Sequence, residues 1–313
     1  MMVRSFRETL VDSHFSRIVQ VVWGGLIVVF ISYYLWHNWV IFSSFNWRFD
    51  FRWMLVALGW AVIRRFLGGI RWVLIALYNH KSYSWPDVAD HLRVYFLSNL
   101  ANYIPGSLWY MASRIQLSRK KGVSTLQTSM GLIYETWLLV WSGCMVGLYV
   151  AVIVFPQNRL NIFIFTSFML ILSLVTIHPK IINLILAHTL RFLKRPPMLL
   201  EVTFSWGLQL WLVSLAVWIA GGLSLFYLLK AFSPDLSLDN FVYVTSASAL
   251  AWTIGFLTPW APSGLGVRDG ILVWLLEVVV AAPLAVAATV GARLMTVIED
   301  LLWAAIVLFL WRK

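Results

Sequence analysis

The stretch "PWAPSGLGVRDG", residues 259–270, decides how this chain is interpreted. It holds two prolines and three glycines, which interrupt a regular helix. Residues 240–267 contain no Lys, Arg, Asp or Glu, and Arg268 and Asp269 then follow directly. In hydrocarbon, unpaired backbone groups are costly, so such a break persists where protein or a watery cavity satisfies them. The stretch therefore predicts a broken helix beside a polar cavity.

The composition places the chain in a membrane. Hydrophobic residues make up 61% of it, charged residues make up 12%, and the mean hydropathy is +0.81. A soluble domain of this length could not bury so much apolar surface. The net charge of +11 comes from Lys and Arg at the ends of apolar runs, which is typical of membrane loops. We therefore expect an integral membrane protein and no binding of nucleic acid.

The apolar runs predict an all-α, polytopic fold. A run of about 20 apolar residues crosses a bilayer as a helix. Residues 94–113 carry no charge but contain a Pro-Gly pair and have basic residues on both sides, which suits a re-entrant hairpin. We expect about eight transmembrane helices, plus re-entrant or broken segments near 94–113 and 259–270. The runs are 18–36, 53–77, 126–154, 160–177, 202–229, 240–258, 268–281 and 284–311.

The loop charges predict the orientation. Residues 114–121 and 178–200 are basic and contain no acidic residue, so they belong on the cytoplasmic side. An even number of crossings then places both termini in the cytoplasm, in a multi-pass protein of the cell membrane. We expect one transmembrane domain over 1–313, with two halves of about 1–158 and 159–313.

Two breaks share one pattern. "NYIPGSLWYMASR", residues 102–114, and the opening stretch each lose regular helix and then supply an arginine. Transporters place broken helices at corresponding positions of two halves and direct helix N-termini at an anion. We expect both breaks to contribute to an anion site, although tight turns with interfacial arginines are the alternative. The candidate residues are Pro105, Gly106, Arg114, Gly264, Gly266 and Arg268.

Glu135 is the one charged residue between Lys121 and Arg159. A charge at the centre of a membrane helix costs about 2.5 to 3.5 kcal/mol or more, so it is usually functional or paired. We expect Glu135 to pair with Arg64, Arg65 or Arg268. Both a role in transport and a structural ion pair are open.

The arginines of the second apolar run differ in depth. Arg64 or Arg65 should face protein, where a forked guanidinium suits phosphate. Arg71 is expected to reach the cytoplasmic interface with its long side chain. Glu299 lies far enough from Lys313 to be embedded in the membrane, so it is a further site candidate.

Neither a metal site nor an active-site motif is apparent. The six histidines lie mostly near span ends without acidic companions at ligand spacing. No P-loop or G-x-S-x-G elbow occurs. We therefore expect no cofactor and a transporter rather than an enzyme. The alternative enzyme is a lipid-linked glycosyltransferase or phosphatase with Glu135 or Glu299 as general base, but the outward loops offer few acids.

Four segments carry a resemblance to a known family. "NYIPGSLWYMASRIQLSRKKGVS", "GLIYETWLL", "PSGLGVRDGILVWLL" and "ARLMTVIEDLLWA" resemble the transmembrane flippase-like domain of lysylphosphatidylglycerol synthases. The most specific part, "GLGVRDG", is close to that family's G-L-G-V-R-E. One departure is "PGSL", where many relatives have Gly-Asp after Pro-Gly. The resemblance favours Glu299 and implies a helical domain that moves or binds anionic or modified lipids.

Some members of that family fuse this domain to a soluble transferase module, which is not found here, so we expect a stand-alone member. The expected function is a flippase for an anionic or modified phospholipid or a polyprenyl-phosphate-linked lipid. The alternatives are a lipid-modifying enzyme and a membrane subunit that recruits a separate synthase or glycosyltransferase. Membrane lipids are the expected partners, and a transferase partner and a homo-oligomer are compatible with the sequence.

Overall fold

The computed structural model describes residues 36, 43, 45, 47–78, 83–103, 109–154, 157, 159–192, 203–258, 264 and 266–310. In this part of the chain every regular element is a helix. Three helical stretches, Phe51–Ala76, Thr125–Ala151 and Phe204–Phe232, are long and apolar enough to cross a membrane. The expected all-α, polytopic membrane fold is confirmed. The expected first span, 18–36, lies almost wholly outside the described residues.

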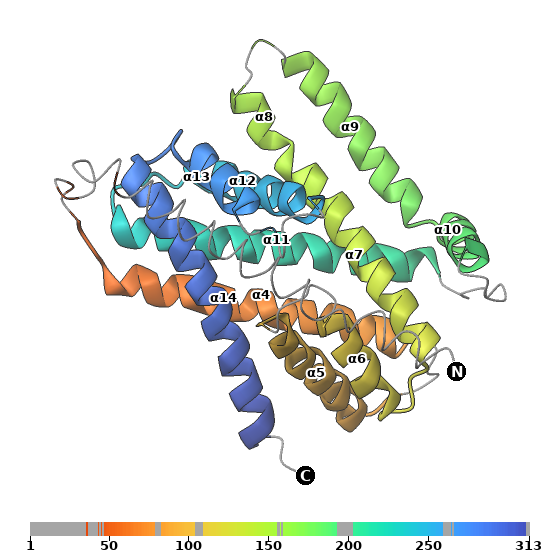
Figure 1. Cartoon of the computed structure of the whole chain (residues 1–313). Helices are drawn as coiled ribbons and strands as arrows, with labels where there is room; N and C mark the ends of the chain where they lie inside the picture. Colours follow the sequence, from red (N-terminus) through yellow and green to blue (C-terminus); the bar gives the residue numbers. More distant parts are fainter. Residues whose placement is uncertain are drawn as a thin grey trace.

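Two long antiparallel helices form the centre of the molecule, α4 (Phe51–Ala76) and α11 (Phe204–Phe232), as Figure 1 shows. At one end, the Asp50 backbone N–H donates to the Ala231 carbonyl over 2.8 Å. At the other end, the Trp206 indole N–H donates to the Leu74 carbonyl over 3.0 Å. These ends are called the Asp50 end and the Ala76 end below.

A first helical hairpin opens at the Ala76 end. It consists of α5 (Trp85–Asn99), the short 3₁₀ turn η1 (Leu100–Tyr103) and α6 (Trp109–Arg119). Ser84 and Asp87 form a capping box that starts α5. The Lys121 ammonium pairs with Asp90 over 2.7 Å at the open end. The segment expected near 94–113 thus begins and ends on the same side of the molecule, and residues 104–108 are not among the described residues.

A second hairpin opens at the opposite, Asp50 end. The Tyr243 hydroxyl in α12 (Asn240–Phe256) donates to the Leu275 carbonyl in α13 (Val267–Leu276) over 2.8 Å. With ten residues, α13 is about 15 Å long, half the thickness of the hydrocarbon core. The runs 240–258 and 268–281, expected as two crossings, therefore form one hairpin.

The remaining helices are α7 (Thr125–Gly147), α8 (Tyr149–Val154), α9 (Arg159–Thr176), α10 (Pro179–Phe192) and α14 (Ala282–Leu310). In Figure 1, α14 crosses α4 obliquely, while α9 and α10 lie at the edge of the bundle. A close approach of α7 to α12 depends on Gly147, because an added Cβ would lie 2.9 Å from the Leu250 backbone.

The order of elements occurs twice. A long helix, a helical hairpin and a second long helix follow one another as α4, α5–α6 and α7, and again as α11, α12–α13 and α14. Since α4 and α11 are antiparallel, the two hairpins open at opposite ends.

Candidate functional site

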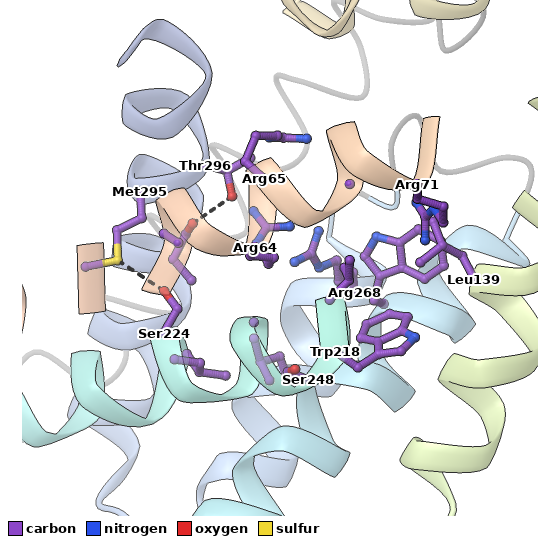
Figure 2. Close-up of a pocket in the computed structure, with 18 of the residues that line it drawn as sticks. Arg64, Arg65, Arg71, Leu139, Trp218, Ser224, Ser248, Arg268, Met295 and Thr296 are labelled. Carbon is purple, nitrogen blue, oxygen red and sulfur yellow. Dashed lines mark hydrogen bonds between the residues drawn. The ribbon is translucent and has the colours of Figure 1, made fainter. Parts of the chain in front are cut away.

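A cavity of about 210 Å³ lies among α4, α11, α12, α13 and α14, and Figure 2 shows it. Tyr95 of α5 and Leu139 of α7 also line it. Among its described lining residues are four arginines and no carboxylate. The arginines come from two helices, three from α4 and one from α13. They are Arg64, Arg65, Arg71 and Arg268.

Arg64 and Arg268 are the two arginines that meet inside the cavity. Figure 2 shows their guanidinium groups turned toward one another. Arg64 forms an ion pair with Glu299 of α14. Arg268 is partly buried, and among the described residues the structure gives it neither an ion pair nor a hydrogen bond. Two like charges are thus held together, and only Arg64 has a carboxylate partner among the described residues, which is unfavourable without a bound anion or water.

Two glycines place Arg268 in this position. Gly264 has φ of 66° and Gly266 has φ of 81°, and both are in the left-handed region that other residues rarely adopt. Gly266 is the N-cap of α13, so Arg268 is the second residue of that helix. An added Cβ on Gly264 would also lie 3.2 Å from the backbone of Gly255 in α12. The glycines therefore turn the chain at the tip of the hairpin and start α13 beside the cavity.

Asp269 follows Arg268 directly in the sequence, but its carboxylate binds other groups. Its carboxylate accepts a hydrogen bond from the Gly266 backbone N–H at 3.2 Å and caps α13. The Arg293 guanidinium of α14 donates to both of its oxygens at 2.7 Å. This bidentate pair ties the hairpin to α14. Asp269 is therefore directed to Arg293 and leaves Arg268 without a carboxylate partner.

Glu299 and Asp300 organise the α4 side of the cavity. Glu299 is completely buried, and the Arg65 guanidinium contacts it at 3.2 Å and Asp300 at 2.8 Å. Figure 2 shows Arg65 directed away from Arg64. Of the two adjacent arginines, Arg65 is therefore held by carboxylates of α14, and Arg64 reaches the interior of the cavity.

A second charged network lies next to the cavity, toward the Ala76 end. Glu135 of α7 accepts hydrogen bonds from Arg71 at 2.9 Å and from Arg114 at 2.8 Å. Arg114 also donates to Asn99 at 2.9 Å and to Ser98 at 3.0 Å. Its guanidinium carbon lies 4.5 Å from the centre of the Tyr95 ring. Arg114 is thus held by the first hairpin and α7, with the Trp72 ring of α4 also beside it.

Two expectations about pairing are corrected by this network. Arg71 was expected at the interface, but it is 2% exposed, because Glu135 and the Ser214 hydroxyl hold it inside. Glu135 was expected to pair with Arg64, Arg65 or Arg268, whereas its partners are Arg71 and Arg114. Helix α4 places Arg71 on the face that meets α7, which the sequence does not reveal.

The predicted site residues therefore fall into two groups. Arg64, Arg65 and Arg268 line the cavity, with Glu299, Gly264 and Gly266 holding them. Arg114 and Glu135 are not among the described lining residues. Glu135 pairs with both Arg114 and Arg71, and Arg71 lines the cavity. Pro105 and Gly106 lie outside the described residues.

The structure adds residues that the sequence did not single out for the site. Trp218 and Trp252 line the cavity from α11 and α12. Nothing in the sequence distinguishes these two from the other 17 tryptophans. The Asp269–Arg293 ion pair also lies beside the site. The sequence feature that could have indicated Asp269 is an acidic residue at the third position of a helix that follows glycines.

Positive charge is in excess around the cavity. Six arginines face four carboxylates in the two networks, so an anion would balance the site. Within the described residues, no group of three or more His, Cys, Asp or Glu is placed to hold a metal ion. The arginines are Arg64, Arg65, Arg71, Arg114, Arg268 and Arg293, and the carboxylates are Glu135, Asp269, Glu299 and Asp300.

Comparison with known proteins agrees with a role at lipids. Residues 19–304 match the family described as the lysylphosphatidylglycerol synthase TM region. No curated protein and no solved structure matches the chain. The match covers nearly the whole sequence and includes both helical hairpins and the cavity. The chain therefore belongs to the lysylphosphatidylglycerol synthase transmembrane-region family.

Proposed function

We propose that this protein is a flippase that moves a lipid with a phosphate headgroup between the leaflets of the cell membrane. The candidate lipids are an anionic or modified phospholipid and a polyprenyl-phosphate-linked lipid. Membership of a lipid-associated membrane family supports this function. The observation that carries it is Arg268, which lies in an arginine-lined cavity without a carboxylate partner among the described residues.

In this mechanism Arg64 and Arg268 hold the phosphate and the acyl chains stay in the bilayer. Guanidinium groups offer forked donors that match phosphate oxygens. A phosphate that leaves water for hydrocarbon loses its hydrogen bonds at a large cost in free energy. Because the cavity replaces those hydrogen bonds, it lowers the barrier that makes unaided crossing slow.

The repeated order of elements suggests how access alternates. The units α4 to α7 and α11 to α14 lie in opposite orientations, and α4 and α11 pack along one another at the centre of the contact between them. Transporters built from inverted repeats rock one unit against the other around a fixed site. We propose the same motion for the halves of about 1–158 and 159–313.

The arrangement also gives a proposed orientation. The basic residues Arg119, Lys120 and Lys121 connect α6 to α7 at the Ala76 end, so this end faces the cytoplasm. Both termini are proposed to lie on that side. In a Cys144→Ser background, an impermeant maleimide should label Lys120→Cys from the inside and Asp235→Cys from the outside. Labelling from the opposite sides would reverse the orientation.

A proteoliposome assay tests the function. Lipids with an acyl-chain fluorophore are distributed over both leaflets, and an external quencher then bleaches the outer leaflet. Vesicles with the protein should lose nearly all fluorescence, whereas protein-free vesicles should lose about half. Mass spectra of the lipids should be unchanged, as expected for a transporter rather than an enzyme. Equal bleaching in both samples, with folded protein present, would refute the flippase function.

A further inference from the structure

The charge of the cavity bears on which headgroup it accepts. The described lining contains four arginines and no carboxylate. The carboxylates around it are engaged by arginines: Glu299 by Arg64 and Arg65, Asp269 by Arg293, and Glu135 by Arg71 and Arg114. A headgroup ammonium would thus enter a positive field without an anionic partner in the lining.

Aromatic faces are the other way to bind an ammonium group. Trp218 and Trp252 line the cavity, but they pack edge to face against each other with ring centres 5.4 Å apart. Trp252 also stacks on Phe256 at 5.3 Å, and the Trp218 indole N–H donates to Ser142. Tyr95 also lines the cavity, and the Arg114 guanidinium lies 4.5 Å from the centre of its ring. The three rings therefore do not form an open aromatic cage.

The cavity has room for a small headgroup. At roughly 10 to 15 Å³ for each water-sized probe, 210 Å³ holds about 15 to 20 water molecules. A phosphate with a small uncharged substituent fits this space. Gly221 of α11 preserves the room for Arg64, since an added Cβ would lie 3.0 Å from the Arg64 Cδ.

We propose that the Arg64–Arg268 cavity selects lipid phosphates whose headgroup carries no amine, and that it excludes zwitterionic and aminoacylated headgroups. This selectivity rests on the proposed transport function and names its substrate class. Phosphatidylglycerol and a polyprenyl monophosphate share the required chemistry, as does free phosphate.

The test compares headgroups in one vesicle preparation. Acyl-labelled phosphatidylglycerol should cross at least ten times faster than acyl-labelled phosphatidylethanolamine or lysylphosphatidylglycerol. Unlabelled polyprenyl monophosphate should compete with the labelled phosphatidylglycerol. If millimolar inorganic phosphate competes equally well, the site recognises the free ion rather than the lipid, and a lipid-selective cavity is overturned.

A single substitution can add a negative charge to the cavity lining. Ser248 lines the cavity, and Ser248→Asp should slow phosphatidylglycerol and reduce its advantage over phosphatidylethanolamine several-fold. Ser205→Asp is the matched control, because Ser205 is exposed in the first turn of α11 and should leave the ratio unchanged. Equal rates for all headgroups in the unmodified protein would overturn the selectivity and leave the flippase function intact.

A binding measurement distinguishes failure of the flippase function from failure of the headgroup selectivity. In detergent, phosphatidylglycerol should raise the Tm of the protein more than phosphatidylethanolamine does. If no lipid crosses but this difference is present, the flippase function is lost and the selectivity stands. If no lipid crosses and the Tm shifts are equal, both are lost.

Discussion

Arg64 and Arg268 face one another in a single cavity, although one lies in the middle of α4 and the other begins the short helix α13. Glu299 pairs with Arg64, while Arg268 has no carboxylate partner among the described residues. This asymmetry makes Arg268 the residue whose charge is most available to a ligand.

Replacement of Arg268 should separate transport from stability. Arg268→Ala should reduce lipid crossing at least tenfold, because one of the two guanidinium groups at the phosphate is lost. Its Tm should be unchanged or higher, since the repulsion from Arg64 also disappears. Arg268→Lys should retain part of the activity, because a point charge replaces the fork. Arg119→Ala, at an exposed position of α6, is the control and should transport normally.

Glu135 should behave as a structural residue. Glu135→Gln leaves two buried arginines, Arg71 and Arg114, without their shared carboxylate. Breaking a buried ion pair in this way costs about 3 to 5 kcal/mol of unfolding free energy. Chemical unfolding in detergent should show the loss, and Arg71→Met in the same chain should restore part of it. A variant with normal stability but no transport would instead assign Glu135 a direct role in the transport cycle.

Removal of the Glu299 charge should make Arg64 available to a ligand. In Glu299→Gln, Asp300 still holds Arg65, whereas Arg64 loses its carboxylate partner. Phosphatidylglycerol should then bind several-fold more tightly and be released more slowly, so its crossing rate should fall. Asp300→Asn is the control, because Asp300 contacts Arg65 and not Arg64 among the ion pairs described. Binding titrations by Tm shift measure both variants.

The glycines at the tip of the second hairpin should resist substitution. Gly264→Ala and Gly266→Ala force a side chain into the left-handed region, at a cost of about 1 to 2 kcal/mol each. Gly264→Ala should cost more, because its Cβ also meets the Gly255 backbone. Gly270→Ala is the contrasting change: it is helical, exposed and has nothing within 4 Å, so stability should hold or rise. Tm measurements in one detergent rank the three variants.

The apolar runs 240–258 and 268–281 show that hydropathy alone does not distinguish two membrane crossings from one short hairpin. Residues 240–258 and 268–281 are each apolar enough to suggest a crossing, and their return as one hairpin becomes visible in the Tyr243–Leu275 hydrogen bond. Arg71 shows the same limit for a side chain. Hydropathy along the chain favours the interface for an arginine near a span end, but the carboxylate that keeps Arg71 inside belongs to another helix, α7.

The sequence by itself determined the helical membrane fold, the break at 259–270 and the presence of arginines within the spans. These properties depend on composition and on residues that are close along the chain. Only the tertiary structure decided that Arg268 meets Arg64 while Arg114 is enclosed by Glu135, Asn99 and Ser98. The physical reason is that charge pairing in a low-dielectric interior depends on which helices pack together, and local sequence does not specify that packing.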